Sequence, residues 1–176
     1  MSIFKPKFFA KTLESFVKQV VPPSMWETFG VKALDKMDQR ICEFIEEFRE
    51  YVDVPLTAND WSWGGRFTQR GVRDVTQYGT YEEMAKSRSD HLTGRAIDLI
   101  SSKLTGHELR AKFIEKEQYW FEKYGINFIE CGELNKDGRV MTWFHCSINI
   151  DQGQGVQYWS PVRGFVTKGE VLEDKL

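Results

Sequence analysis

Apolar residues recur at helical spacing in three stretches of the chain, residues 8–21, 33–50 and 106–124. An apolar residue at every third or fourth position forms a stripe along one side of a helix, so each stretch predicts an amphipathic helix. Pro22 and Pro23 follow the first stretch and Gly125 follows the third, and both residue types favour a helix end. The stripes comprise Phe9, Leu13, Phe16, Val17 and Val20, then Leu34, Met37, Ile41, Phe44, Ile45 and Phe48, then Leu109, Phe113, Trp120, Phe121 and Tyr124.

Shorter apolar or alternating runs predict strands. Residues 96–100, Ala-Ile-Asp-Leu-Ile, form a short buried strand interrupted by one Asp, and a β-like segment precedes it within residues 52–65. Two further runs, 126–134 and 139–150, are joined by Asn-Lys-Asp-Gly, and Asp-Gly between alternating runs is a strong hairpin signal. These elements predict an α+β fold, in which helices pack on a small, mainly antiparallel sheet.

The length of 176 residues suits one compact domain with a short arm. We expect an amphipathic N-terminal arm at residues 1–30, a main domain at residues 31–160 and a C-terminal tail at residues 161–176. Gly153, Gly155 and Pro161 predict loop and trailing segment after the last strand. The apolar face of the N-terminal helix either packs on the domain or docks a partner, and the sequence leaves both open.

Composition and charge limit the partners and the compartment that we expect for this protein. A net charge of -2 gives no electrostatic support for a nucleic-acid partner. No apolar run approaches the roughly 20 residues that cross a bilayer, and the N-terminus lacks a signal peptide's features, so we expect a soluble protein without an export signal. Cys42, Cys131 and Cys146 are odd in number, lack Cys-x-x-Cys spacing and fall on apolar faces, which predicts buried free thiols in a reducing compartment.

Candidate chemistry begins with Asp98, the single charged residue in the predicted buried strand. Burying a carboxylate costs several kcal/mol unless a charge or a metal compensates it. His91 lies seven residues earlier in a polar segment, and a metal bound by both would compensate Asp98. The alternative is an Asp satisfied by backbone amides or by Arg95.

The predicted hairpin adds two further groups. Strand alternation puts His145 on one face and Cys146 on the other. One hairpin register places Glu130 opposite Trp143 and another places it opposite His145, so Glu130 shares the face of His145 in both. Two His, an Asp and a nearby Glu match the needs of a catalytic zinc site with three ligands and a carboxylate base, whereas a lone strand His is usually just hydrogen-bonded.

Residues 89–98, Ser-Asp-His-Leu-Thr-Gly-Arg-Ala-Ile-Asp, fit the S-x-H-x-x-G-x-A-x-D motif at all five fixed positions. In this they resemble the family of zinc D-Ala-D-Ala carboxypeptidases and L-Ala-D-Glu endopeptidases, whose fold hedgehog signalling domains share. A looser resemblance covers roughly residues 30–150. The resemblance implies that His91, Asp98 and His145 bind Zn²⁺ and that Ser89 contacts substrate or supports the ligands.

The resemblance also implies an arginine upstream of the motif in a Gly-x-Arg context, which holds a substrate carboxylate or stabilises the transition state. Gly71-Val72-Arg73 fits, so Arg73 is the candidate, with Arg66 and Arg70 as weaker alternatives. His107 is expected to be a surface residue near a helix start.

The chain departs from the family around its last ligand. Many members have a carboxylate where this chain has Thr142, others have a second His where it has Trp143, and some phage-type relatives have Asp where it has Ser147. The catalytic base is therefore predicted to be Glu130, because Glu133 has the opposite strand parity and Asp137 lies in the predicted turn.

These features lead to one functional prediction and one alternative. The prediction is a zinc peptidase that cleaves beside a D-amino acid in bacterial peptidoglycan, as a phage lysis or virion-associated enzyme. Such an enzyme would be made in the host cytoplasm and would act at the cell wall after release, or in the virion. The alternative is a non-catalytic virion or wall-binding module that contacts assembly partners through its N-terminal arm. The bond cleaved, the choice of endo- or exopeptidase action and the oligomeric state stay open.

Overall fold

A computed structural model describes residues 4–132, 142–150, 155–174 and 176, and over these residues it confirms the α+β class. One six-stranded sheet has the order β1-β2-β4-β3-β5-β6, with every neighbouring pair antiparallel except the parallel pair β3 and β5. The strands are β1 (Leu56–Thr57), β2 (Ala96–Ser101), β3 (Phe128–Glu130), β4 (Phe144–Ser147), β5 (Gln157–Ser160) and β6 (Gly164–Val166).

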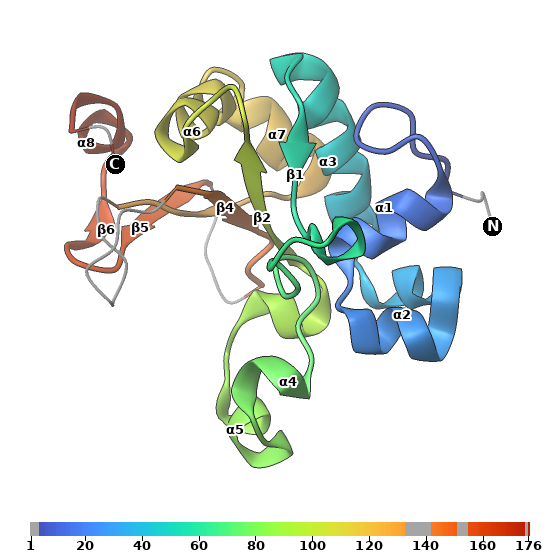
Figure 1. Ribbon diagram of the computed structural model, residues 1–176. Helices are drawn as coiled ribbons and strands as arrows, with labels where there is room; N and C mark the ends of the chain where they lie inside the picture. The colour runs from blue at the N-terminus through green and yellow to red at the C-terminus, as the bar shows by residue number, and fades with distance from the viewer. Residues whose placement is uncertain (1–3, 133–141, 151–154, 175) are drawn as a thin grey trace.

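Helices gather on one side of this sheet, where α3, α6 and α7 lie together (Figure 1). The α-helices are α1 (Leu13–Val20), α2 (Pro23–Phe29), α3 (Gln39–Val52), α4 (Val75–Tyr78), α5 (Tyr81–Lys86), α6 (Gly106–Ile114), α7 (Glu117–Tyr124) and α8 (Lys168–Glu173). Within the described residues, the 3₁₀ helices are η1 (Gly30–Lys36), η2 (Trp61–Trp63) and η3 (Asp90–Thr93).

An aromatic core joins these helices to the sheet. Phe44 and Phe48 of α3 stack with their ring centroids 5.2 Å apart, and Trp120 of α7 packs edge-on against both. Phe144 of β4 packs against Phe48 from the sheet, with the two ring centroids 5.3 Å apart. All four side chains are buried, so this packing fixes the inner face of β4 against the helices.

The predicted helix at residues 33–50 starts later than expected. Residues 30–36 form η1, and α3 begins at Gln39 after the side chain of Asp38 accepts a hydrogen bond from the Arg40 amide. The Asp38 amide meanwhile donates to the carbonyl of Gly94. The N-cap of Asp38 and its hydrogen bond to Gly94 fix the turn of the chain between η1 and α3.

The stretch 106–124 contains two helices instead of the one predicted. α6 ends at Ile114 and α7 starts at Glu117, because Lys116 leaves the helical region with φ -132° and ψ 28°. This break lets Phe113 and Trp120 both face α3. Gly125 ends α7 with φ +74°, as its position predicted.

The N-terminal segment is helical over a shorter range than residues 8–21. The amides of Lys7, Phe8 and Phe9 donate to the carboxylate of Glu46 in α3, so they do not form helix. α1 then carries its apolar face into the main core, where Phe16, Val17 and Val20 are fully buried. The face on which the docking alternative rests is therefore inside the protein.

The C-terminal segment was predicted as loop, and that prediction is wrong. β5 pairs with β3, β6 pairs with β5, and α8 follows. Thr167 and Glu170 form a capping box at the start of α8, and this spacing is readable in the sequence. The carbonyl of Leu176 accepts a hydrogen bond from Arg110 of α6, at 2.6 Å, which ties the chain end to the core.

The predicted strand pair is present, with Glu130 of β3 directly opposite His145 of β4. Of the two registers considered, the structure has the one that pairs these residues, and the predicted turn at 135–138 lies outside the described residues. Cys146 faces the core side beside Ile129, and all three cysteines are buried free thiols, as predicted.

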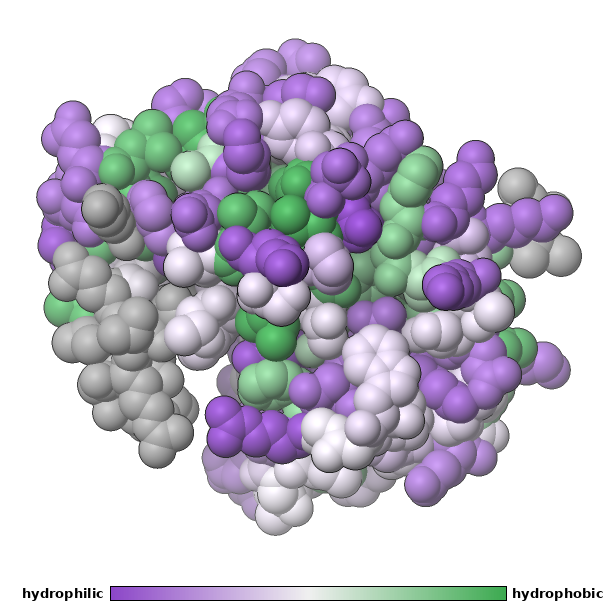
Figure 2. All heavy atoms as spheres, turned by 45° about the horizontal axis from the view of Figure 1, so that its top comes forward, coloured by the Kyte–Doolittle hydropathy of each residue, from purple (hydrophilic) through white to green (hydrophobic). Residues whose placement is uncertain are grey.

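The long segment between β1 and β2 contains η2, α4, α5 and η3; α4 and α5 lie together at the bottom of the view in Figure 1, and η3 contacts β2. On the face shown in Figure 2, apolar side chains form small areas between charged and polar ones. Among the described helices, none combines the length and the apolar character that crossing a membrane requires.

Candidate metal centre

Three polar side chains form a row across the sheet. Asp98 of β2 pairs with His145 of β4, and His145 pairs with Glu130 of β3. Residues directly opposite each other on adjacent antiparallel strands point to the same face. Asp98 and His145 are buried on this face, whereas Glu130 at the end of the row is half-buried.

His91 reaches the row from η3, which precedes β2. The turn depends on Gly94, whose φ of +68° favours glycine and whose hydrogen faces the backbone of η1. A Cβ at this position would lie 2.0 Å from the carbonyl oxygen of Lys36. Two features therefore require glycine at position 94: its positive φ and the close approach of the η1 backbone.

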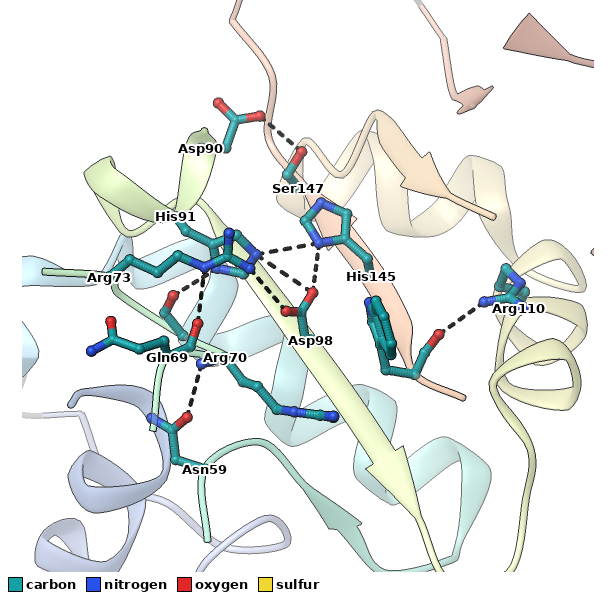
Figure 3. A network of polar contacts seen from close by, with 12 residues as sticks. Asn59, Gln69, Arg70, Arg73, Asp90, His91, Asp98, Arg110, His145 and Ser147 are labelled. Carbon is teal, nitrogen blue, oxygen red and sulfur yellow. Dashed lines mark hydrogen bonds and ion pairs between the residues drawn. The ribbon is translucent and has the colours of Figure 1, made fainter. Parts of the chain in front are cut away.

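His91, Asp98 and His145 point toward one another (Figure 3), and they form a buried group that can hold a metal ion. The His91 Nε2 atom lies 3.3 Å from His145 Nδ1 and 3.5 Å from Asp98 Oδ1. His145 Nδ1 and Asp98 Oδ1 are closer, at 2.7 Å, because they share a hydrogen bond. Bonds of about 2.0–2.1 Å at tetrahedral angles, as in a zinc site, place ligand atoms about 3.3 Å apart. The two separations from His91 Nε2 match this value, and the hydrogen-bonded pair His145 Nδ1 and Asp98 Oδ1 would move apart on binding the ion.

The tautomer of His91 suits a ligand role. Its Nδ1 lies 2.7 Å from the carbonyl oxygen of Gly71, which can only accept a hydrogen bond, so the proton sits on Nδ1. The Nε2 lone pair consequently faces His145 and Asp98. A backbone partner of this kind both orients a metal-binding imidazole and selects its tautomer.

Burial and mutual charge shift the titration of all three groups. Burial lowers the pKa of His91. Burial acts to raise the pKa of Asp98, but the charge of His91 and the contacts of both histidines outweigh it and hold that pKa well below its usual range. Burial acts to lower the pKa of His145, but its hydrogen bond to Asp98 and the nearby carboxylates raise it. The site therefore favours an ionised Asp98 that attracts positive charge.

Arg73 supplies part of that charge. Its Nη2 lies 3.2 Å from Asp98 Oδ2, the oxygen turned away from the two histidines, and its Nε donates to the Gln69 carbonyl at 3.0 Å. Its amide also donates to the His91 carbonyl. The predicted Gly-x-Arg residue thus lies beside the candidate metal ligands and forms an ion pair with one of them, Asp98.

Glu130 lies next to His145 in the same row and is half-buried. Burial raises the pKa of its carboxyl group, and the nearby Asp98 adds to this, whereas His145 and Arg73 oppose it. A carboxyl group with a raised pKa can release and recover a proton closer to neutral pH. The strand register pairs Glu130 with His145, so Glu130 lies beside the candidate ligands, as predicted.

The other predicted residues lie around this group. Ser89 caps the start of η3 with its backbone and is half-buried, outside the lining of the pocket beside Asp98. Thr142, which the sequence comparison with the motif singled out as a departure, is exposed. His107 is the second residue of α6 and contacts the Leu176 carbonyl at 3.2 Å, far in the fold from η3.

A pocket of about 260 Å³ opens beside Asp98, and the segment between β1 and β2 supplies most of its walls. Arg70 and Arg73 both line it, together with the more exposed Arg66. The two weaker arginine alternatives therefore lie in the same pocket as the preferred one.

Some residues that build the site were not anticipated. Asn59 is fully buried, accepts a hydrogen bond from the Arg70 amide at 2.8 Å and donates to the Val21 carbonyl. Asp74 holds the Gln69 amide at 3.0 Å and also bonds Ser24 of α2. Polar residues in a long loop carry no periodic signal, so the sequence does not separate these supports from solvent-facing neighbours.

Comparisons with protein-family models, with curated proteins and with solved structures each found no match for this chain. The case for its chemistry therefore rests on the residues and on the geometry described above.

Proposed function

We propose that this protein is a zinc-dependent peptidase that cleaves a peptide bond beside a D-amino acid in the stem peptides of bacterial peptidoglycan. The observation that carries the proposal is the convergence of His91 Nε2, Asp98 Oδ1 and His145 Nδ1 on one buried point, with a carboxylate on the adjacent strand. The family motif that contains His91 and Asp98 supplies the substrate class.

His91, Asp98 and His145 would hold the ion, which supplies Lewis-acid chemistry by polarising the scissile carbonyl and lowering the pKa of water. Glu130 takes a proton from the attacking water and passes it to the leaving amine, so that a C–O bond forms, the C–N bond breaks and the Glu130 carboxylate is regenerated. Arg73, which contacts Asp98, stabilises the negative charge that develops on the carbonyl oxygen.

The proposal is tested by measuring new amino groups released from purified peptidoglycan by the zinc-loaded protein. We expect release by the wild type, loss with a chelator, recovery on adding zinc, and loss in His91→Ala. His107→Ala is the matched control, because it removes an imidazole that lies in α6, outside the candidate metal group, and contacts the Leu176 carbonyl. Absence of release by the wild type, or full activity of His91→Ala, would refute the proposal.

A second candidate is a wall-binding or virion module that keeps the metal for stability. The observation that favours it is the exposed Thr142 at the position where the family usually has its carboxylate. It predicts stoichiometric zinc, a lower melting temperature after chelation and binding to peptidoglycan without any cleavage. The amino-group assay and a metal analysis on the same sample separate the two candidates.

A further inference from the structure

The row of side chains that begins at the candidate metal centre continues past Glu130 to the edge of the sheet. Glu130 of β3 is paired with Trp159 of β5, and Trp159 is paired with Phe165 of β6. Residues paired across neighbouring strands point to the same face of a sheet, because side chains alternate along each strand. His145, Glu130, Trp159 and Phe165 therefore share one face, and the last two residues of the row are aromatic.

These two aromatic residues lie outside the core. Their strand neighbours Tyr158 and Val166 pack on the core, and the Tyr158 hydroxyl donates a hydrogen bond to Glu117 of α7. Phe165, by contrast, is 64% exposed, and Trp159 is half-buried. β5 and β6 form the left end of the sheet in Figure 1, away from α1 and α2. A ligand can therefore reach the Phe165 ring from solvent.

Internal packing does not account for the two rings. Among the described residues, neither ring packs against another aromatic ring, and the indole N–H of Trp159 forms no hydrogen bond. Phe128, two residues before Glu130 on the same face, lies with its ring centroid 6.4 Å from that of His145. Aromatic side chains thus lead from a candidate metal ligand to the edge of the sheet.

The surface formed by Trp159 and Phe165 has the chemistry that binds a sugar ring. The C–H groups on one face of a pyranose pack on aromatic rings, while the hydroxyl and acetamide groups at its rim accept a hydrogen bond from a donor such as an indole N–H. Neither ring carries a charge, so the surface favours a neutral ligand over an ion.

Distances along the row indicate which sugar can reach this surface. Neighbouring strands lie about 4.8 Å apart, which puts Trp159 about 10 Å and Phe165 about 15 Å from His145. In peptidoglycan the first stem residue, L-Ala, is joined through a lactyl group to N-acetylmuramic acid, whose carboxyl group is consumed in that amide. At about 3.5 Å for each link, this neutral sugar begins about 7 Å from the L-Ala–D-Glu bond but about 17 Å from the D-Ala–D-Ala bond. The first spacing places the sugar over β5, and the second places it beyond β6.

We propose that Trp159 and Phe165 form a subsite for the N-acetylmuramic acid ring of the substrate, and that the bond cleaved is the one between L-Ala and D-Glu. The assignment rests on the proposed function, because the stem peptide is taken to be cut at the metal centre. Water adds to the L-Ala carbonyl, and the D-Glu nitrogen leaves as an amine. The protein is then an endopeptidase that binds the glycan together with the start of the stem.

The experiment measures kcat and KM of the zinc-loaded, 176-residue protein for two peptides that differ only in the sugar. One is N-acetylmuramyl-L-Ala-D-Glu-L-Lys, and the other is lactyl-L-Ala-D-Glu-L-Lys. We expect the wild type to prefer the muramyl peptide by roughly 10-fold in kcat/KM, mostly through KM, as suits two contacts with aromatic rings. A ratio close to one would overturn the subsite.

Variants of the two rings connect that ratio to this surface. Trp159→Ala should bring the ratio close to one, and Trp159→Phe should keep part of it, because a ring remains while the N–H is lost. Phe165→Ala should lower the ratio less, and it removes little packing because this side chain is mostly exposed. Phe29→Ala removes another exposed ring, from α2, and is the control that should leave the ratio unchanged. An undiminished ratio in both Trp159→Ala and Phe165→Ala would overturn the subsite.

Failure of the subsite and failure of the proposed function give different results. If no peptide is cleaved, the proposed function fails, and calorimetric titration of the muramyl and lactyl peptides still tests the subsite. Tighter binding of the muramyl peptide that Phe165→Ala weakens supports it, and equal binding of the two peptides overturns it. Cleavage of an acyl-D-Ala-D-Ala peptide while both L-Ala-D-Glu peptides stay intact would keep the peptidase and overturn the subsite.

Discussion

Alternate residues of β2 and β4 face two different environments. On one side, Leu99 and Phe144 are fully buried against the helices α3 and α6, where they meet only apolar and aromatic neighbours. On the other side, Asp98 and His145 are also buried, yet they meet one another, His91 and an arginine. The same two strands thus supply both the core and the candidate metal centre.

The difference lies in what burial does to the free energy of unfolding. Burying an apolar side chain such as Leu99 stabilises the fold by about 1.5–3 kcal/mol. Burying the charge of Asp98 costs several kcal/mol, which only partners or a cation can offset. The core face should therefore determine stability, while the polar face should determine metal binding and catalysis, and substitutions on each face test this separation.

The largest expected effect is on activity, from Glu130→Gln on the polar face. Loss of a proton-transfer group lowers kcat by about 10²- to 10⁴-fold. Gln keeps the size of the side chain and removes a half-buried charge, so neither zinc content nor melting temperature should fall. The checks are amino-group release, metal analysis and thermal unfolding, and Glu122→Gln on the exposed side of α7 is the control. Retained cleavage would move the base away from β3.

Phe48→Ala tests the core face. Phe48 is fully buried and contacts Phe44, Trp120 and Phe144, so its removal leaves a cavity. We expect the free energy of unfolding to fall by about 3–5 kcal/mol, measured by urea denaturation. The zinc content of the protein that remains folded should be unchanged. A loss of zinc binding in the folded variant would show that the two faces are coupled.

Zinc itself should stabilise the protein through the polar face. A ligand that binds only the folded state adds about 2.7 kcal/mol at a free concentration 100 times its Kd. We expect zinc to raise the melting temperature of the wild type and of His107→Ala, and chelation to reverse the rise. His91→Ala should show no rise, because one of the three ligand atoms is gone. Equal stabilisation of His91→Ala would place the ion elsewhere.

The two faces also differ in how far the sequence predicts them. Strand alternation is a local pattern, so the shared face of His145 and Glu130 and the core position of Cys146 followed from parity alone. The link from His91 to Asp98 came from the spacing of a motif. The contact of Arg70 with Trp143 shows only in the structure, because the two residues lie far apart in the chain.

Element boundaries were less predictable for a related reason. The break at Lys116 has no Gly or Pro to mark it and follows from packing of both helices on α3. β5 forms by pairing with the edge of β3. This pairing depends on the tertiary structure, so the short run at residues 157–160 does not predict a strand by itself. The capping box that starts α8 is different, because Thr167 and Glu170 stand at a readable spacing and could have corrected the predicted tail.

The smallest expected effect is within the polar face, at the link between β4 and η3 that Ser147 forms. Its hydroxyl donates to an Asp90 carboxylate oxygen at 2.9 Å, which ties the strand carrying His145 to the 3₁₀ helix carrying His91. Ser147→Ala removes one hydrogen bond and should lower the free energy of unfolding by about 0.5–1.5 kcal/mol. The same bond holds the elements that carry His145 and His91 at a fixed separation, so its loss should weaken zinc affinity. Cys146→Ala is the control, one residue away on the core side, and it should lower stability without changing the Kd for zinc. A calorimetric titration of both variants decides the matter, and equal zinc affinities would show that η3 holds His91 in place without help from β4.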